Sequence, residues 1–171
     1  IIFSILLFNI YIYPNLSKWD YFPYIDTIIQ QYTGKRLMSG REYIWPALLD
    51  IIAQKPFLGH GPGTVSSDFI DFGSSAHNLY LQIALQTGYL GLISFFILLF
   101  NFWLIIWKAR HNKIVQLSAS FFITTLIHQS FEISLIQNQL AVGIMQWLVL
   151  GIGISFVIHK DVNKKQQHQK L

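Results

Sequence analysis

The sequence predicts an all-α integral membrane protein: a polytopic helical bundle with one large, partly helical loop outside the membrane. First, 53% of the 171 residues are hydrophobic and only 12% are charged, against about 25% charged in an ordinary soluble domain. Second, several apolar runs approach the ~20 residues that a helix needs to cross a bilayer. Third, a long segment rich in aromatic and polar residues separates the first run from the others.

Four apolar segments are expected to be membrane spans. Two of them hold nineteen and twenty consecutive residues without an ionisable charge. The third carries His128 and Glu132. The first stops at Pro14 and lacks the basic start of a signal peptide, so we expect it to be the end of a truncated span. The expected spans are 1–13, 89–107, 114–136 and 139–158.

Basic residues give the expected orientation of these spans. The short loop 108–113 contains two lysines and one arginine without an acid, and the tail 159–171 contains four lysines. Lys and Arg in short loops favour the cytoplasmic side, so both segments should be cytoplasmic. Segment 14–88, with 75 residues, five basic and six acidic side chains, should then be extracytoplasmic.

The first helix expected in this large loop lies near 40–54. Ser39 and Glu42 have the S-x-x-E spacing of a capping box, and apolar residues follow at helical spacing. Pro46 is expected to kink this helix. Segment 56–63, P-F-L-G-H-G-P-G, is rich in turn residues and cannot continue it.

A second helix is expected over 76–87. Ser75 is the predicted N-cap, and His77 and Asn78 would lie in the first turn. Gly88 would end this helix or act as a hinge before the next span.

Arg41 and His77 therefore lie at two helix starts. Helix N-termini attract anions and phosphates, and the same field keeps a histidine neutral and able to accept a proton. The guanidinium of Arg41 adds a donor fork that suits phosphate. The two residues form a candidate site for a phosphorylated ligand at the membrane surface, although helix-start residues often only cap.

Composition and spacing exclude or weaken other chemistries. The chain has no Cys, so disulfides, thiolate metal sites and cysteine nucleophiles are absent, and no metal site or cofactor is expected. Its basic residues are too scattered for nucleic-acid binding, and Gly34-Lys35 lacks the frame of a nucleotide-binding loop. Asp68 and Asp71 could hydrolyse sugars as a carboxylate pair, but their spacing is common on polar surfaces.

His77-Asn78, nine residues, Gly88, two residues and Gly91 fit the H-[NSQ]-x9-G-x-x-G pattern of bacterial O-antigen ligases and O-antigen polymerases. S-G-R-E-Y-I-W at 39–45 and P-F-L-G-H-G-P-G at 56–63 resemble the other landmarks of that family's outer loop, in the same order. The resemblance covers about residues 33–100 and implies a GT-C-like bundle in the bacterial cytoplasmic membrane, with further N-terminal spans.

The resemblance implies a lipid-linked oligosaccharide glycosyltransferase. The expected partners are an undecaprenyl-pyrophosphate-linked glycan donor, a glycan acceptor, membrane lipid and other polysaccharide assembly proteins. Arg41 would stabilise the pyrophosphate leaving group, and His77 would accept the proton of the acceptor hydroxyl. Further expected substrate contacts are Asn78, Lys35, Arg36, His60, His128 and Glu132.

His128 and Glu132 are four residues apart and would share one face of a span, so they could reach the same site or form a structural pair. Ile occurs 26 times and Lys outnumbers Arg by nine to three, a bias of AT-rich genomes, in which many bacteria lack lipopolysaccharide. This favours a polymerase of O-antigen, capsule or exopolysaccharide repeats over a ligase that transfers the finished glycan to lipid A core. A non-catalytic transport or flippase component, or an inactive fragment, is the alternative of another class.

Overall fold

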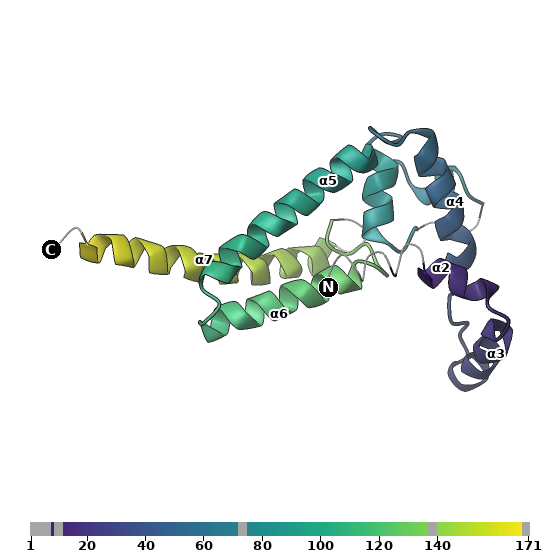
Figure 1. The fold of residues 1–171 in the computed structure, drawn as a ribbon, viewed down its shortest axis with the longest axis horizontal. Coiled ribbons are helices and arrows are strands. Elements are labelled where there is room, and N and C mark those ends of the chain that lie inside the picture. Colours follow the sequence, from purple (N-terminus) through teal and green to yellow (C-terminus); the bar gives the residue numbers. More distant parts are fainter. Residues whose placement is uncertain (1–7, 9–11, 72–74, 137–139, 169–171) are drawn as a thin grey trace. The chain divides into compact units, whose positions relative to one another are not determined.

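A computed structural model describes residues 8, 12–71, 75–136 and 140–168, and within these ranges every regular element is a helix (Figure 1). The elements are α2 (Tyr13–Asn15), η2 (Leu16–Lys18), α3 (Phe22–Thr33), α4 (Arg41–Gln54), η3 (Ser66–Asp68), α5 (Leu79–Lys108), α6 (Lys113–His128) and α7 (Leu140–His168). The all-α prediction is confirmed for this part of the chain. The chain divides into two compact units, Ile1–Leu92 with Ser130–Glu132, and Ile93–Gln129 with Ile133–Leu171.

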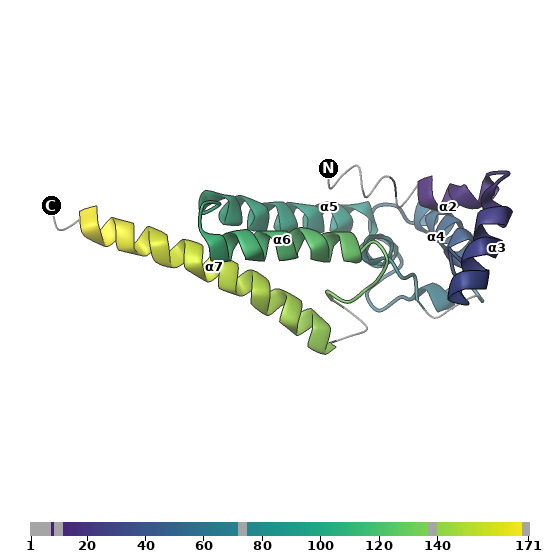
Figure 2. The ribbon, with the colours of Figure 1, turned by 90° about the horizontal axis from the view of Figure 1, so that it is seen from below.

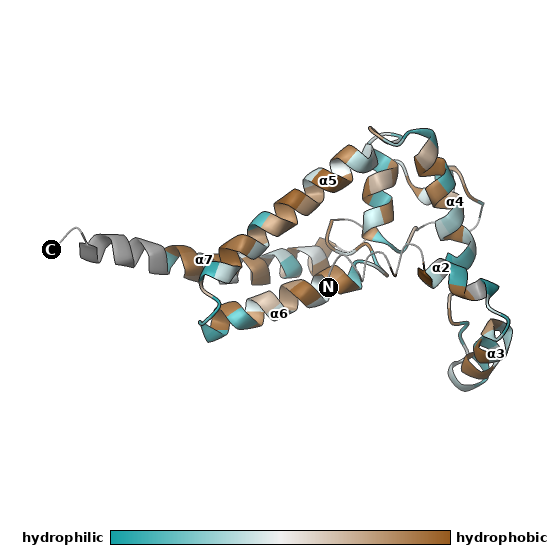
Figure 3. Ribbon diagram, viewed as in Figure 1, coloured by the Kyte–Doolittle hydropathy of each residue, from teal (hydrophilic) through white to brown (hydrophobic). Residues whose placement is uncertain are grey.

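Two of these helices are long and apolar enough to cross a membrane, namely Leu79–Lys108 and Leu140–His159 (Figure 3). Many of their large apolar side chains are exposed, among them Phe100 and Leu148. Such wide exposed apolar surface is typical of helices that face lipid. They contain the runs predicted at 89–107 and 139–158, apart from Gln139, whereas the predicted first span, 1–13, lies almost wholly outside the described residues.

The third predicted span, 114–136, is helical as expected to His128 and wrong from residue 129 on. Helix α6 ends at His128 after 16 residues, and residues 129–136 are not helical. Gln129 is fully buried, and its Oε1 accepts hydrogen bonds from the backbone N–H groups of Ser134 and Leu135 at 3.0 and 3.1 Å. The Gln129 side chain thus provides the hydrogen bonds that these non-helical N–H groups need. The apolar sequence alone would predict that this segment is helical.

In the second unit, a short turn after α5 reverses the chain into α6 (Figure 2). Asn112 caps α6, because its Oδ1 accepts hydrogen bonds from the N–H groups of Ile114 and Val115 at 2.8 and 3.3 Å. Helix α6 packs on α7, where the Ser118 hydroxyl donates to the Val149 carbonyl at 2.9 Å.

The start of α4 differs from the predicted capping box. Gly40, with a left-handed φ of 89°, is the N-cap, and no side chain caps this helix. The Ser39 hydroxyl instead donates to the Arg36 carbonyl at 3.1 Å. Ser39 is therefore used by the preceding turn, and Glu42 lies in the first helical turn without a capping partner. Pro46 lies inside α4, which remains one helix to Gln54.

The start of α5 also differs from the prediction, by three residues. Asn78, not Ser75, caps this helix, since its Oδ1 accepts from the N–H groups of Tyr80 and Leu81 at 3.0 and 3.1 Å. His77 lies outside the helix with a φ of 45°. A non-glycine residue in this region is uncommon and often marks a functional position.

Gly88 interrupts α5 with φ 66° and ψ −170°, as the hinge prediction expected. Segment 56–61 binds both sides of the break. The N–H groups of His60 and Gly61 donate to the carbonyls of Leu85 and Gln86 at 2.8 and 3.0 Å. Beyond the break, the Tyr89 N–H donates to the Pro56 carbonyl at 2.7 Å. The loop therefore satisfies backbone groups that the interrupted helix cannot pair.

The same contact explains the glycines in these motifs. A Cβ atom on Gly88 would overlap the backbone of Phe57, and one on Gly59 would lie 2.5 Å from the carbonyl carbon of Gln86. Both positions have positive φ. The two backbones can therefore approach only where neither has a side chain.

We expect Gly88→Ala to destabilise the protein by about 2 kcal/mol or more, because it adds a left-handed alanine and a clash with the Phe57 backbone. Thermal unfolding in detergent measures the change. Gly151→Ala is the matched control, since a Cβ there meets nothing within 4 Å. Equal unfolding midpoints for the two variants would contradict the proposed role of the break.

Candidate active site

Arg41 is the first residue of α4 and is half-buried. Its Nη2 donates to the Phe131 carbonyl at 3.4 Å, a long hydrogen bond. Its Nε is buried and has no hydrogen-bond partner. A buried donor without a partner is costly, so this guanidinium retains capacity to bind an anionic ligand.

His77 faces Glu132 in the same unit. The His77 Nδ1 lies 3.5 Å from Glu132 Oε2, with 45% and 39% of the two side chains exposed. This separation is within range for an ion pair but too long for a hydrogen bond. Nδ1 itself is buried, so the exposed part of the His77 side chain is its remainder, which includes Nε2.

Residues 131 and 132 therefore bring the two candidate catalytic side chains to one segment. Arg41 contacts the carbonyl of Phe131, and His77 contacts the carboxylate of the next residue, Glu132. A cation, an imidazole and a carboxylate thus gather within one compact unit. This grouping can bind a phosphate and accept a proton.

An aromatic cluster supports this segment. The Trp45 indole N–H donates to the Ala76 carbonyl at 2.8 Å, and this bond is buried. It ties α4 to the residue before His77. The Tyr13 ring lies 5.5 Å from the Trp45 ring and 5.7 Å from the Phe131 ring, measured between centroids. The cluster thus links α4, the His77 turn and residue 131.

Asn78 holds its position by capping α5. Its Oδ1 is used by the helix, whereas its Nδ2 is buried and has no hydrogen-bond partner. The structure thus shows a capping role for Asn78, whose side chain is fully buried.

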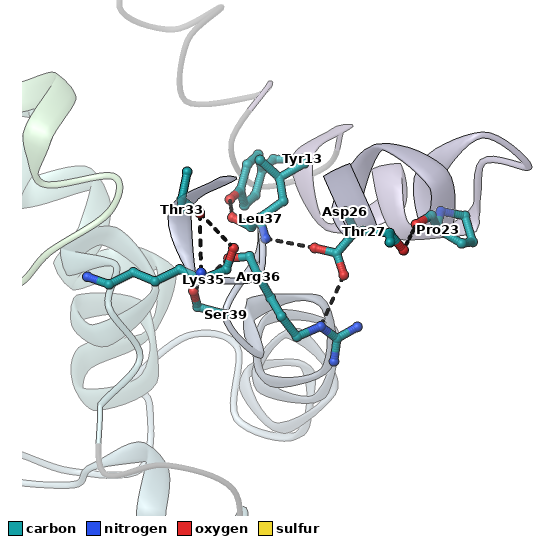
Figure 4. A network of polar contacts seen from close by, with 9 residues as sticks. All are labelled: Tyr13, Pro23, Asp26, Thr27, Thr33, Lys35, Arg36, Leu37 and Ser39. Carbon is teal, nitrogen blue, oxygen red and sulfur yellow. Dashed lines mark hydrogen bonds and ion pairs between the residues drawn. The ribbon is translucent and has the colours of Figure 1, made fainter. Parts of the chain in front are cut away.

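Arg36 pairs with Asp26, and the structure gives neither Arg36 nor Lys35 a side-chain bond to Arg41 or His77. Arg36 Nε binds Asp26 Oδ2 at 3.1 Å, and Asp26 Oδ1 accepts from the Leu37 N–H at 2.7 Å (Figure 4). The Leu37 N–H is the main cause that lowers the pKa of Asp26 below its ordinary value, with a further contribution from Arg36. The Lys35 side chain is exposed and extends away from this network (Figure 4).

His60 has structural partners. Its Nε2 lies 2.9 Å from the Ile51 carbonyl, and its ring packs edge-on against Phe69 at 4.8 Å. Together with the backbone contact to Leu85, these bonds anchor the loop at the α5 break. This arrangement favours a turn that joins two helices over a sugar contact.

The predicted common face of His128 and Glu132 is wrong, because α6 ends at His128 and Glu132 lies in the non-helical segment that follows. His128 is exposed and belongs to the other unit. Asp68 accepts a hydrogen bond from the Val65 N–H at 2.9 Å, so one of the two candidate hydrolytic carboxylates is a local cap.

The sequence alone did not identify three residues of this site. Tyr13, Trp45 and Phe131 hold it together through ring contacts and a buried indole bond. Trp45 had a sequence signal in the aromatic content of segment 14–88 and in the motif at 39–45, whereas Tyr13 and Phe131 lie outside that segment. Among the described residues, no group of three or more His, Cys, Asp or Glu side chains is placed to hold a metal ion.

The model of one protein family, described as O-antigen ligase, matches residues 1–96. This match covers more than half of the 171 residues. The chain belongs to the O-antigen ligase family. No curated protein and no solved structure matches it.

Membership of the O-antigen ligase family agrees with the resemblance found in the motifs at 39–45, 56–63 and 77–91. It indicates an enzyme with ligase- or polymerase-type function. Together with the two apolar helices, it also indicates a membrane protein. The matched region includes Arg41 and His77 but ends before Glu132.

Trp45→Phe is expected to destabilise the protein by about 1–3 kcal/mol, because it leaves the buried Ala76 carbonyl without its donor. The measurement is thermal unfolding in detergent. Trp107→Phe is the control, since Trp107 is half-exposed and its ring contacts Arg110 at the surface. An equally small effect of both substitutions would mean that the indole bond does not support the site.

Asp26→Asn is expected to lower stability at neutral pH and to remove part of the acid sensitivity. Because the native pKa of Asp26 is lowered, its carboxylate stabilises the fold above the ordinary pKa of 3.8. This stabilisation is lost as the pH falls through the lower native pKa. Unfolding midpoints across this acidic range test the prediction, with the exposed Asp20→Asn as control. Identical pH profiles for both variants would refute it.

Proposed function

We propose that the protein transfers an oligosaccharide from undecaprenyl pyrophosphate to a hydroxyl of an acceptor glycan, and so polymerises repeat units of a surface polysaccharide. The observation that carries this proposal is the approach of Arg41 and His77 to the adjacent residues Phe131 and Glu132. Family membership supports the enzyme class. The proposed location is the outer face of the bacterial cytoplasmic membrane, in a multi-pass GT-C-like bundle.

In the proposed reaction, His77 Nε2 accepts the proton of the acceptor hydroxyl. The hydroxyl oxygen then bonds to the anomeric carbon as the bond from that carbon to the pyrophosphate oxygen breaks. The leaving pyrophosphate keeps the electron pair. Glu132, 3.5 Å from Nδ1, stabilises the imidazolium that forms, and catalytic contacts that are long without substrate often tighten when it is bound.

Arg41 is proposed to bind the pyrophosphate. The diphosphate gains negative charge as the glycosidic bond breaks, and a positioned guanidinium stabilises that charge. The Nε of Arg41 has no hydrogen-bond partner, so the guanidinium keeps a donor for phosphate oxygens. No nucleotide sugar, metal or other cofactor enters this scheme.

Ligase activity on a lipid A core is the second candidate, because the family carries that description. The two activities leave different intermediates. A defective polymerase accumulates single lipid-linked repeats, whereas a defective ligase accumulates finished lipid-linked chains. Lipid-linked intermediates therefore distinguish the two enzymes.

The test uses the full-length protein in a strain that lacks its own copy, at matched expression. His77→Ala should reduce polymer formation by about 10²–10⁴-fold through loss of the base. Arg41→Ala should reduce it by about 10²–10³-fold through loss of charge stabilisation. Glu132→Gln should cause a smaller loss, because its role is to support His77.

Arg110→Ala and His111→Ala are matched controls, as both side chains are exposed in the other unit. Both should keep wild-type chain length. Wild-type polymer in both Arg41→Ala and His77→Ala would overturn the proposal and favour a transport or flippase component. Loss of polymer with accumulated long lipid-linked chains would favour the ligase.

A further inference from the structure

Helix α3 is amphipathic, and much of its apolar face is exposed. Taking ~100° per residue, Tyr24, Ile25 and Tyr32 lie on one side of the helix. Two half-buried isoleucines belong to the same side, Ile28 between them and Ile29 next to the buried edge. Tyr24 is 70% exposed and Tyr32 87% exposed. The polar residues Thr27 and Gln30 occupy the opposite side, and Gln31 lies at the edge beside Tyr24.

A separate edge of the helix holds it to the first unit. Phe22 and Asp26 are its buried residues, and Asp26 binds Arg36 and the Leu37 N–H (Figure 4). The helix ends at Gly34, whose N–H donates to the Gln30 carbonyl at 2.9 Å. The bonds of Asp26 thus attach the helix to the first unit through its buried edge, and leave the exposed apolar side chains free of this attachment.

The chemistry of this face matches a bilayer interface. Its exposed aromatics are tyrosines, and Trp19 and Tyr21 directly before the helix are also exposed. Trp and Tyr carry an apolar body with a polar tip and concentrate where lipid headgroups meet the hydrocarbon. A protein partner would have to supply a hydrogen-bond partner for each buried tyrosine hydroxyl, whereas headgroups and water do so at an interface.

Basic residues flank the helix at both ends. Lys18 precedes it and Lys35 follows it, and both are exposed. Asp20 is the exposed acid nearby, and Asp26 is occupied by Arg36. The two lysines suit the phosphates of anionic lipids.

We propose that α3, with Trp19 and Tyr21, is an interfacial helix that docks its apolar face on the headgroup region of the membrane crossed by the long apolar helices. This surface is separate from the Arg41 and His77 site. It would fix the height of the outer loop relative to the bilayer. Failure of the glycosyl-transfer proposal would leave it unaffected.

The test places single spin labels on the full-length protein in lipid vesicles. Residues 1–171 contain no Cys, so any cysteine elsewhere is replaced by Ser. Labels at Ile25 and Tyr32 should collide with oxygen, relative to a water-soluble nickel chelate, at least about twofold more than labels at Thr27 and Gln30. The difference should grow when phosphatidylglycerol is added to phosphatidylcholine.

A second measurement avoids labels. The fluorescence of Trp19, taken as the difference between wild type and Trp19→Phe, should be quenched more by lipids brominated near the headgroup than by lipids brominated near the chain end. Equal collision ratios on both faces would mean a solvated helix. Exclusion of both reagents at Ile25 and Tyr32 would mean burial against protein, and no quenching of Trp19 would agree with either. Each of these results would overturn the proposal.

Discussion

The backbone contact between segment 56–61 and the break at Gly88 is the constraint on which the first unit depends. A helix that is interrupted at one residue leaves carbonyl and N–H groups without partners inside the helix. The loop supplies partners on both sides of the break, at Leu85, Gln86 and Tyr89. The two glycine-containing motifs of the sequence are therefore the two halves of one contact.

This contact also determines where the candidate site can form. The segment of α5 before Gly88 is capped by Asn78, next to His77. The loop that binds the break follows directly on α4, which begins with Arg41. The Trp45 indole also binds the carbonyl of Ala76, the residue before His77. Two connections thus link the parts of the chain that carry Arg41 and His77: the bond from Trp45 of α4 to Ala76, and the contact of the loop after α4 with α5.

Much of this arrangement could be predicted from local sequence. Apolar periodicity located α4, and charge-free runs located the two long apolar helices, because both signals depend on burial alone. Caps were less predictable, because side chains such as Ser39 and Asn78 can form hydrogen bonds with several nearby backbone groups. The end of α6 depends on the buried side chain of Gln129, which no apolarity pattern reveals. The pairing of His77 with Glu132 follows from that helix end, so it too lay beyond local reasoning.

Glu132 reaches the first unit from a stretch of only three residues, Ser130–Glu132, whose chain neighbours on both sides belong to the second unit. The family match stops at residue 96. A fragment cut at the end of the recognisable family region would retain the arginine and the imidazole but lose the carboxylate. The unit that contains the candidate site is thus discontinuous in sequence, and useful boundaries for expression or chimeras must follow the fold and extend past α6.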